Sequence, residues 1–186
     1  LASRSEAVDK PADKRKTIAM LLYPQFTALD LVGPHHIFSA LQGYRVELVW
    51  KTTDPVSSDF GLAVKPTLTL EDCPEELAVL FVPGGTAGTV KMMEDKDILE
   101  FLKSRGEKSE YVTSVCTGAL VLGAAGLLKG RRATTHWAYV DMLPLVGAHY
   151  EKARVVRDDN IFTAGGVTSG VDFAFRIVVE LAGPEV

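Results

Sequence analysis

Residues Tyr111 to Gly126 read Tyr-Val-Thr-Ser-Val-Cys-Thr-Gly-Ala-Leu-Val-Leu-Gly-Ala-Ala-Gly, and the change of pattern within them decides the fold. The first part is rich in residues that favour strands, and the second has the small residues and the period of a closely packed helix. Cys116 lies at the junction. The pattern is typical of a strand that turns sharply into a helix, with a nucleophile held at the turn.

The rest of the chain repeats this alternation of short apolar runs and helix-period stretches. The apolar runs predict strands buried on both faces, at residues 18–22, 46–50, 77–82 and 111–115. Helices are expected at residues 28–41, 95–107, 117–128, 137–143 and 169–181, and hairpins at residues 56–70 and 153–163. The order predicts an α/β fold, a doubly wound and mostly parallel sheet flanked by helices, with a nucleophile elbow at Cys116.

Composition limits the classes of function. A chain of 186 residues that is 47% hydrophobic can build one substantial core, and we expect a single domain over residues 17–186 after a disordered leader at residues 1–16. The net charge of −4, with Lys and Arg interspersed among acids, argues against nucleic acid as a partner. No apolar run approaches the ~20 residues that cross a bilayer, so no membrane partner is expected. The two cysteines are expected to be reduced thiols in a cytoplasm.

Cys116 is the candidate nucleophile because of its position. It follows a strand at the edge where open α/β folds place their sites, and it precedes a helix whose positive end is expected to lower the thiol pKa. The alternative is a buried cysteine that acts as a small hydrophobe. Cys73 lies in an acidic turn that should raise its pKa, and we interpret it as structural. Neither cysteine has a second Cys or a His at zinc-site spacing, so no metal is expected.

Asp30 is the candidate proton partner for the thiol. It follows the first strand in an apolar setting, where partial burial would raise its pKa into the range useful for acid and base catalysis. The alternative is an aspartate that caps or charges the first turn of its helix. His136 could also reach the site, but a His beside Trp at a helix start is more often packed and hydrogen-bonded.

Gly84 and Gly85 follow a strand and offer unobstructed backbone N–H groups, so they are candidates for an oxyanion or substrate-binding loop. They could equally serve only to permit a tight turn. The pair Gly165-Gly166, which follows the second predicted hairpin, has the same two interpretations.

Together these motifs resemble the DJ-1/PfpI superfamily, from Thr17 to about Leu181, with its class I glutamine amidotransferase-like fold. Within the superfamily, Asp30 in Leu-Asp-Leu-Val-Gly-Pro and Thr117 directly after Cys116 look most like isocyanide hydratase. The resemblance implies that Cys116 attacks the terminal carbon of R–N≡C, that Asp30 shuttles protons, and that Thr117 assists by hydrogen bonding. It also implies a cofactor-independent hydratase that releases an N-substituted formamide through a thioimidate, and a homodimer with the site near the interface.

Two other functions fit some of the same residues. The Cys-Thr-Gly elbow and the stretch Ala-Thr-Thr-His-Trp at residues 133–137 also resemble the N-terminal domain of AraC-type regulators, where a DJ-1-like fold senses a ligand. A DJ-1-type glyoxalase or deglycase, or a PfpI-like peptidase, is a third possibility. Asp at position 30 in place of Glu and Thr at position 117 in place of His count against both members of that third group.

Overall fold

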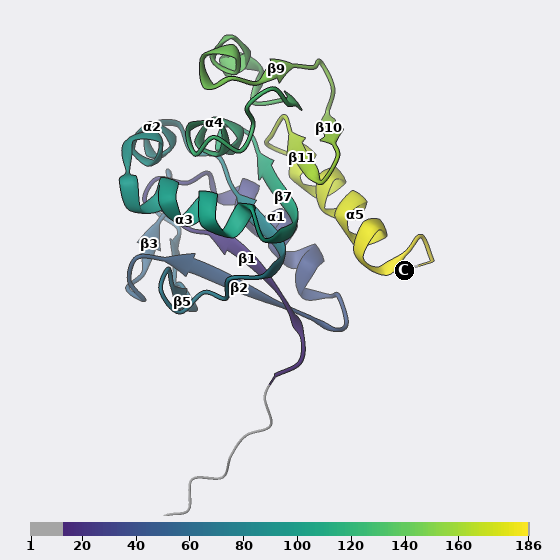
Figure 1. Ribbon diagram of the computed structural model, residues 1–186. Coiled ribbons are helices and arrows are strands. Elements are labelled where there is room, and N and C mark those ends of the chain that lie inside the picture. Colours follow the sequence, from purple (N-terminus) through teal and green to yellow (C-terminus); the bar gives the residue numbers. More distant parts are fainter. Residues whose placement is uncertain (1–12, 186) are drawn as a thin grey trace, which may run out of the picture.

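The structure, a computed structural model, describes residues 13–185. Its centre is a seven-stranded sheet in the order β10-β11-β7-β6-β1-β2-β5, parallel throughout except for the pair β10 and β11 (Figure 1). The strands are β1 (Lys16–Leu21), β2 (Tyr44–Trp50), β5 (Leu68–Thr69), β6 (Leu77–Val82), β7 (Ser109–Val115), β10 (Val155–Asp158) and β11 (Ile161–Ala164). The predicted doubly wound, mostly parallel α/β fold is confirmed, and the four strands expected from the apolar runs lie side by side as β7, β6, β1 and β2.

Helices form a layer on each side of this sheet. On one side α1 (Ala28–Ser39) packs against α5 (Ser169–Ala182), and on the other α4 (Gly118–Ala124) contacts both α2 (Thr86–Glu94) and α3 (Lys96–Gly106) (Figure 1). All six residues of β6 are buried, as are all of β1 except its first. Because both faces of these strands are covered, their sequences are continuously apolar instead of alternating.

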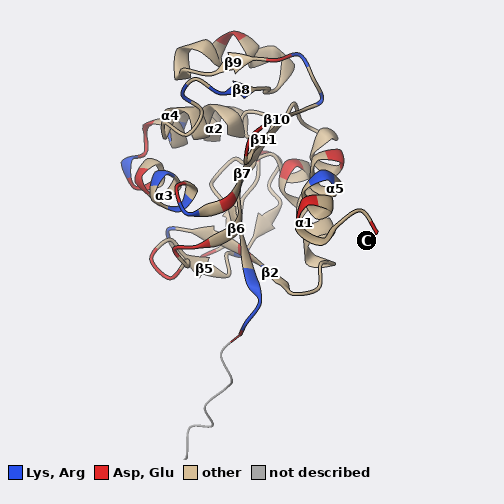
Figure 2. Cartoon of the chain, turned by 45° about the vertical axis from the view of Figure 1, so that its right-hand side comes forward, with Lys and Arg blue, Asp and Glu red and all other residues tan. Residues whose placement is uncertain are grey.

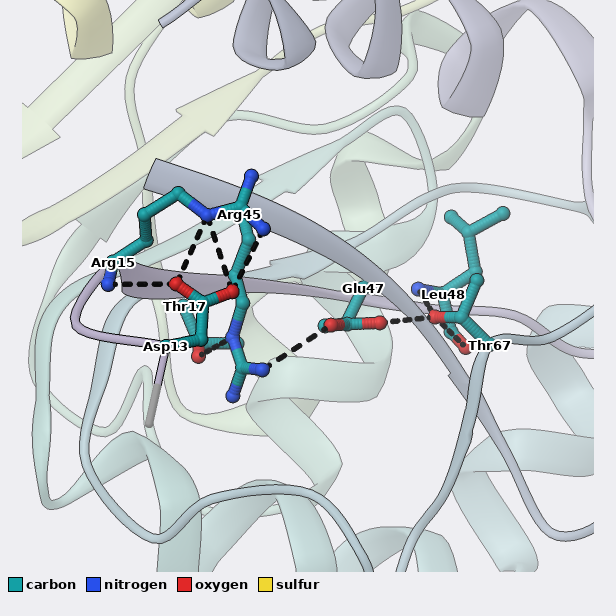
Figure 3. Close-up of polar contacts among 7 residues, drawn as sticks. All are labelled: Asp13, Arg15, Thr17, Arg45, Glu47, Leu48 and Thr67. Atoms are coloured by element: carbon teal, nitrogen blue, oxygen red, sulfur yellow. Dashed lines mark hydrogen bonds and ion pairs between the residues drawn. The ribbon is translucent and has the colours of Figure 1, made fainter. Parts of the chain in front are cut away.

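Strand β2, which has only the short strand β5 beyond it, is less buried, and polar side chains link it to its neighbours (Figure 3). Arg45 Nε donates to Thr17 Oγ1 at 3.0 Å, which joins β2 to β1. The backbone N–H of Leu48 donates to Thr67 Oγ1 at 2.9 Å, which joins β2 to the segment before β5. Residues 1–12 lie outside the described part of the chain, so most of the predicted leader cannot be compared with the structure; β1 begins at Lys16, one residue before the predicted domain boundary.

Small elements extend the central sheet at its edges or form two separate two-stranded sheets. The predicted hairpin at residues 153–163 is present as β10 and β11, and it joins the main sheet through β11 and β7. The other predicted hairpin is shorter than expected, with β3 (Val56–Ser57) paired to β4 (Ala63–Val64), while residues 68–69 join the main sheet as β5. Beside α4 lie β8 (Arg132–Ala133), β9 (His149–Tyr150), η1 (Trp137–Met142) and η2 (Pro144–Val146) (Figure 1).

Three helix predictions need correction. Helix α2 was not expected, because Pro-Gly-Gly-Thr-Ala-Gly at residues 83–88 has the composition of a loop; the helix begins at Thr86, directly after that glycine pair. Helix α4 ends at Ala124 and not at residue 128, since Gly126 has a φ of +84° that a helix cannot continue through. The segment expected to be a helix at residues 137–143 forms a 3₁₀ helix with Tyr139 outside helical geometry.

Candidate active site

Cys116 occupies a sharp turn between β7 and α4. Its φ is +57°, a left-handed conformation that is strained for a residue with a side chain. Two hydrogen bonds hold the turn: the Cys116 N–H donates to the Ala164 carbonyl at 2.8 Å, and Thr135 Oγ1 donates to the Cys116 carbonyl at 2.9 Å. The backbone therefore forms the predicted strand-to-helix elbow, at the carboxyl ends of β7 and β11.

Glycines surround the elbow because no side chain fits beside it. A Cβ at Gly84 would lie 2.8 Å from Cys116 Sγ and 2.7 Å from Asp30 Oδ2, so these two atoms face each other across a single glycine. A Cβ at Gly166 would lie 2.6 Å from Cys116 Cβ, on a backbone whose φ is +72°. A Cβ at Gly118 would lie 2.3 Å from the Val82 carbonyl oxygen. The thiol thus lies in a close backbone cradle built from three separate parts of the chain.

Asp30 is fully buried on α1, with its carboxylate directed at the elbow. Its Oδ2 accepts a hydrogen bond from the Gly84 N–H at 3.1 Å, and its Oδ1 has no partner among the described residues. Burial raises the pKa of Asp30 to about 7, and the hydrogen bonds from Cys116 and Gly84 only partly oppose this rise. The predicted increase is confirmed. Asp30 lies in the first turn of α1, as the alternative interpretation has it, but it does not cap the helix, whose N-cap position is Thr27.

The expected lowering of the Cys116 pKa is wrong in direction. Burial raises the pKa of the thiol to about 12, and the neighbouring Asp30 carboxylate raises it further. Hydrogen bonds from the backbone and the side chain of Thr117 act in the opposite direction. Desolvation, which the position of Cys116 before a helix does not reveal, is the largest cause of the raised pKa. Cys116 and Asp30 therefore titrate as a pair that holds one proton between them over a wide range above neutral pH.

Gly84 lies beside the thiol and Gly85 beside Thr117, and their N–H groups donate to acceptors within the protein. Gly84 donates to Asp30, and Gly85 donates to Thr117 Oγ1 at 3.0 Å. Thr117 Oγ1 also lies 2.7 Å from Thr89 Oγ1, which lies 3.3 Å from the hydroxyl of Tyr23. The glycine loop thus holds both the acid and the threonine next to the nucleophile, while its oxyanion role stays a prediction.

The histidines have no polar contact with Cys116 or Asp30. His136 lies against Trp137, with ring centroids 5.4 Å apart, and its Nδ1 accepts from the Ala138 N–H at 3.3 Å, so it is packed and hydrogen-bonded. Cys73 is buried and free, and burial raises its pKa to about 11. The acids next to it in sequence are not the cause, which corrects that part of the prediction. Within residues 13–185, no cluster of three His, Cys, Asp or Glu side chains could hold a metal ion.

Comparison with known proteins shows the family to which this chain belongs. The model of the DJ-1/PfpI family matches residues 16–180. The chain belongs to the DJ-1/PfpI family. The isonitrile hydratase of Pseudomonas putida is 56% identical over 166 residues, which are 89% of this chain and 72% of that relative. The glutathione-independent glyoxalase DJR-1.2 of Caenorhabditis elegans is 31% identical over 77% of this chain and 76% of that protein.

A solved structure agrees with the family assignment. The crystal structure of a ThiJ/PfpI family protein from Pseudomonas syringae matches with a TM-score of 0.88 and 49% identity, over 97% of this chain and 76% of that one. No helix in residues 13–185 is long and apolar enough to span a membrane.

Three residues at the site were not singled out from the sequence: Thr135, Thr89 and Tyr23. Gly166 was noted from the sequence as half of a glycine pair with two interpretations, and the structure places it against Cys116. Thr135 lies in a stretch noted only for its histidine. The sequence carries no signal for Tyr23 or Thr89. Tyr23 follows the first strand like any core aromatic residue, and Thr89 lies on the helix that was not predicted.

Proposed function

We propose that this DJ-1/PfpI protein is an isocyanide hydratase that adds water to R–N≡C and releases an N-substituted formamide. The observation that carries the proposal is the buried pair of Cys116 and Asp30, facing each other across Gly84 in a chain that is 56% identical to a hydratase. The pair supplies a soft nucleophile and a proton donor in one desolvated place. This chemistry suits an isocyanide carbon, which is a soft electrophile.

The proposed reaction begins with transfer of the shared proton to Asp30, which leaves Cys116 as the thiolate. The thiolate attacks the terminal carbon, and Asp30 returns the proton to that carbon, giving the thioimidate R–N=CH–S–Cys. Water then adds to the thioimidate carbon and loses a proton to Asp30, which passes it to the nitrogen to give R–NH–CH(OH)–S–Cys. The hydroxyl then gives its proton to Asp30 as the C=O bond forms and the C–S bond breaks, so R–NH–CHO leaves with the thiolate and the protonated Asp30 restored.

The environment of the two groups fits these steps. An Asp30 carboxyl whose pKa is about 7 can both give and accept a proton near neutral pH, which an exposed aspartate cannot do efficiently. The hydrogen bonds of Thr117 favour the thiolate that the attack requires. The proposed cycle uses no metal and no cofactor.

We further propose that two copies of the chain associate through α1 and α5. Exposed apolar side chains gather on these two neighbouring helices, where Leu29, Val32, Val171, Phe175 and Val179 are between 38% and 57% exposed. The helices also border a hollow of about 270 Å³ that is lined mainly by apolar side chains. The free thiols Cys73 and Cys116 suit a reducing cytoplasm, where we place the enzyme.

The proposal is tested by incubating the purified protein with an alkyl isocyanide and measuring the formamide by chromatography. Wild type should turn the substrate over. Cys116→Ala should remove the activity while the circular dichroism spectrum and the melting temperature persist. Cys73→Ala, the matched control at the other buried cysteine, should retain turnover if it folds. Turnover by Cys116→Ala at the wild-type rate would reject the mechanism.

A further inference from the structure

A row of buried hydroxyl groups leads away from the nucleophile. Thr117, Thr89 and Tyr23 are each at most 3% exposed, and they come from the elbow, from α2 and from the segment after β1. The contacts run from Thr117 Oγ1 to Thr89 Oγ1 at 2.7 Å, from there to the Tyr23 hydroxyl at 3.3 Å, and from Tyr23 to the Pro83 carbonyl at 2.8 Å. The row therefore connects Thr117, the residue after Cys116, to the Pro83-Gly84 loop, whose Gly84 N–H donates to Asp30.

The number of hydrogens fixes the direction of this row. Each hydroxyl carries one hydrogen, and the Pro83 carbonyl can only accept, so Tyr23 donates to Pro83. The Tyr23 oxygen must then accept from Thr89, and Thr89 must accept from Thr117. In this arrangement the single hydrogen of Thr117 is directed at Thr89 and is unavailable to the sulfur of Cys116.

We propose that Tyr23 and Thr89 are positioning residues that control whether Thr117 donates its hydrogen to Thr89 or to the sulfur of Cys116. The inference rests on the proposed role of Cys116 as the nucleophile. In the second arrangement Thr117 donates to the thiolate, Thr89 turns to donate to Thr117, and Tyr23 loses its donor. The hydroxyl hydrogens of Thr117 and Thr89 rotate, and the Thr89–Tyr23 hydrogen bond is replaced by one from Thr117 to sulfur. No proton is transferred between residues.

The geometry favours this exchange. The bond that is lost, at 3.3 Å, is the longest in the row and therefore the weakest. The oxygen atoms stay in place because Gly85 N–H holds Thr117, and because α2 packs against Tyr23 so closely that a Cβ at Gly88 would lie 2.9 Å from the tyrosine ring. When Thr117 donates to Cys116 instead of Thr89, that hydrogen bond lowers the thiol pKa.

The titratable groups around Cys116 come from three elements. Asp30 faces it from α1, and Tyr23 lies behind Thr89 after β1. Asp59, on the hairpin between β3 and β4, acts on both of them through space. Burial raises the pKa of Tyr23, so its hydroxyl stays protonated and keeps its bond to Pro83. Over the range in which Cys116 titrates, the row can therefore change only by rotation of its threonine hydroxyls.

The test is the pH profile of Cys116 alkylation by iodoacetamide, followed by peptide mapping so that Cys73 does not contribute. Thr89→Val leaves Thr117 with the sulfur as its remaining acceptor, so the midpoint of the profile should fall by about half to one pH unit, a three- to tenfold larger thiolate fraction. Thr89→Ser keeps the hydroxyl and should restore the wild-type midpoint. Thr113→Val removes another buried hydroxyl, which donates to the Leu80 carbonyl outside the row, and should leave the midpoint unchanged.

A second set of variants separates this effect from a structural one. Tyr23→Phe removes the acceptor for Thr89 and should lower the midpoint in the same direction, so the test survives if Thr89→Val does not fold. Thr117→Val should raise the midpoint, and adding Thr89→Val to it should cause no further shift. An unshifted midpoint in both Thr89→Val and Tyr23→Phe, or a downward shift that persists without the Thr117 hydroxyl, would overturn the inference. Absence of isocyanide turnover alongside the expected shifts would reject the proposed function alone, because alkylation does not require that substrate.

Discussion

The carboxyl group of Asp30 is buried away from water, and this burial affects the free energy of unfolding as well as the proton transfer proposed above. Its pKa rises from an ordinary 3.8 to about 7 because burial disfavours the carboxylate. A carboxyl with a raised folded-state pKa does not lower stability well below pH 3.8, where it is protonated in both the folded and the unfolded state. The folded state loses stability as the pH rises towards 7, by up to roughly 4 kcal/mol.

We therefore expect Asp30→Asn to be more stable than wild type at pH 8 and nearly equal to it at pH 4, because the amide has no charge to bury. Urea unfolding at both pH values measures the difference. The same variant should lose turnover number with little change in KM, since the carboxyl is proposed to move protons and not to bind substrate. A stability gain that is equal at both pH values would show that ionisation of Asp30 is not its cause.

The adjacent glycines Gly165 and Gly166 differ in the space that surrounds them. A Cβ at Gly166 would lie 2.6 Å from Cys116 Cβ on a backbone with positive φ, whereas a Cβ at Gly165 would meet nothing closer than 3.4 Å. Gly166→Ala should therefore destabilise the fold by about 2–4 kcal/mol and remove activity, because it overpacks the elbow. Gly165→Ala should stay within about 1 kcal/mol of wild type and remain active. Equal effects in thermal unfolding would contradict this account of the cradle.

At the scale of elements, the packing of α4 against the end of β6 places the nucleophile. The helix can approach so closely because it begins with Gly118, where a Cβ would lie 2.3 Å from the Val82 carbonyl and 2.7 Å from that of Pro83. Both obstacles are backbone atoms, so a larger residue must move the whole helix. Six of the seven residues of α4 are buried, which ties that movement to the core.

We expect Gly118→Ala to lower the free energy of unfolding by about 3 kcal/mol and to reduce turnover at least tenfold, since the elbow moves with α4. Urea denaturation and the isocyanide assay measure the two effects. Val90→Ala, on the exposed side of the neighbouring helix α2, should change neither by a comparable amount. Full activity in Gly118→Ala would mean that the elbow tolerates displacement of its helix.

Over the whole molecule, charged and apolar surfaces are distributed differently. Both acidic and basic side chains lie along α3, as Figure 2 shows, whereas exposed apolar side chains gather on α1 and α5. The first arrangement gives no basic stripe of the kind that binds nucleic acid. The second is the surface that we propose to be buried between two copies of the chain.

Phe175→Glu should convert the proposed dimer to a monomer, because it would bury an unpaired carboxylate in an apolar interface. Light scattering after size exclusion measures the mass. Val90→Glu is the matched control, since Val90 is 54% exposed on α2 against 57% for Phe175 on α5, and it should leave the mass unchanged. A wild-type protein that is already monomeric at micromolar concentration would exclude this interface.

The sequence by itself determined the central strands, the elbow at Cys116 and the burial of Asp30. These features depend on local pattern: continuous apolar runs for β1 and β6, small residues after Cys116, and apolar neighbours on both sides of Asp30. The spacing of apolar residues along the chain indicates which residues are buried, because apolar side chains line the face of a strand or helix that packs against the core. The family resemblance was carried by the same short motifs, which is why it could be seen without a structure.

Only the tertiary structure decided the electrostatics and the hydrogen bonds of the site. The thiol pKa rises because burial outweighs the helix terminus, and the extent of burial depends on how α1, β6 and β11 converge on Cys116. The bond from Gly84 to Asp30 joins residues 54 positions apart, and that from Tyr23 to Pro83 joins residues 60 apart. Desolvation and hydrogen-bond direction arise from such distant neighbours, so no local pattern around Cys116 could have predicted them.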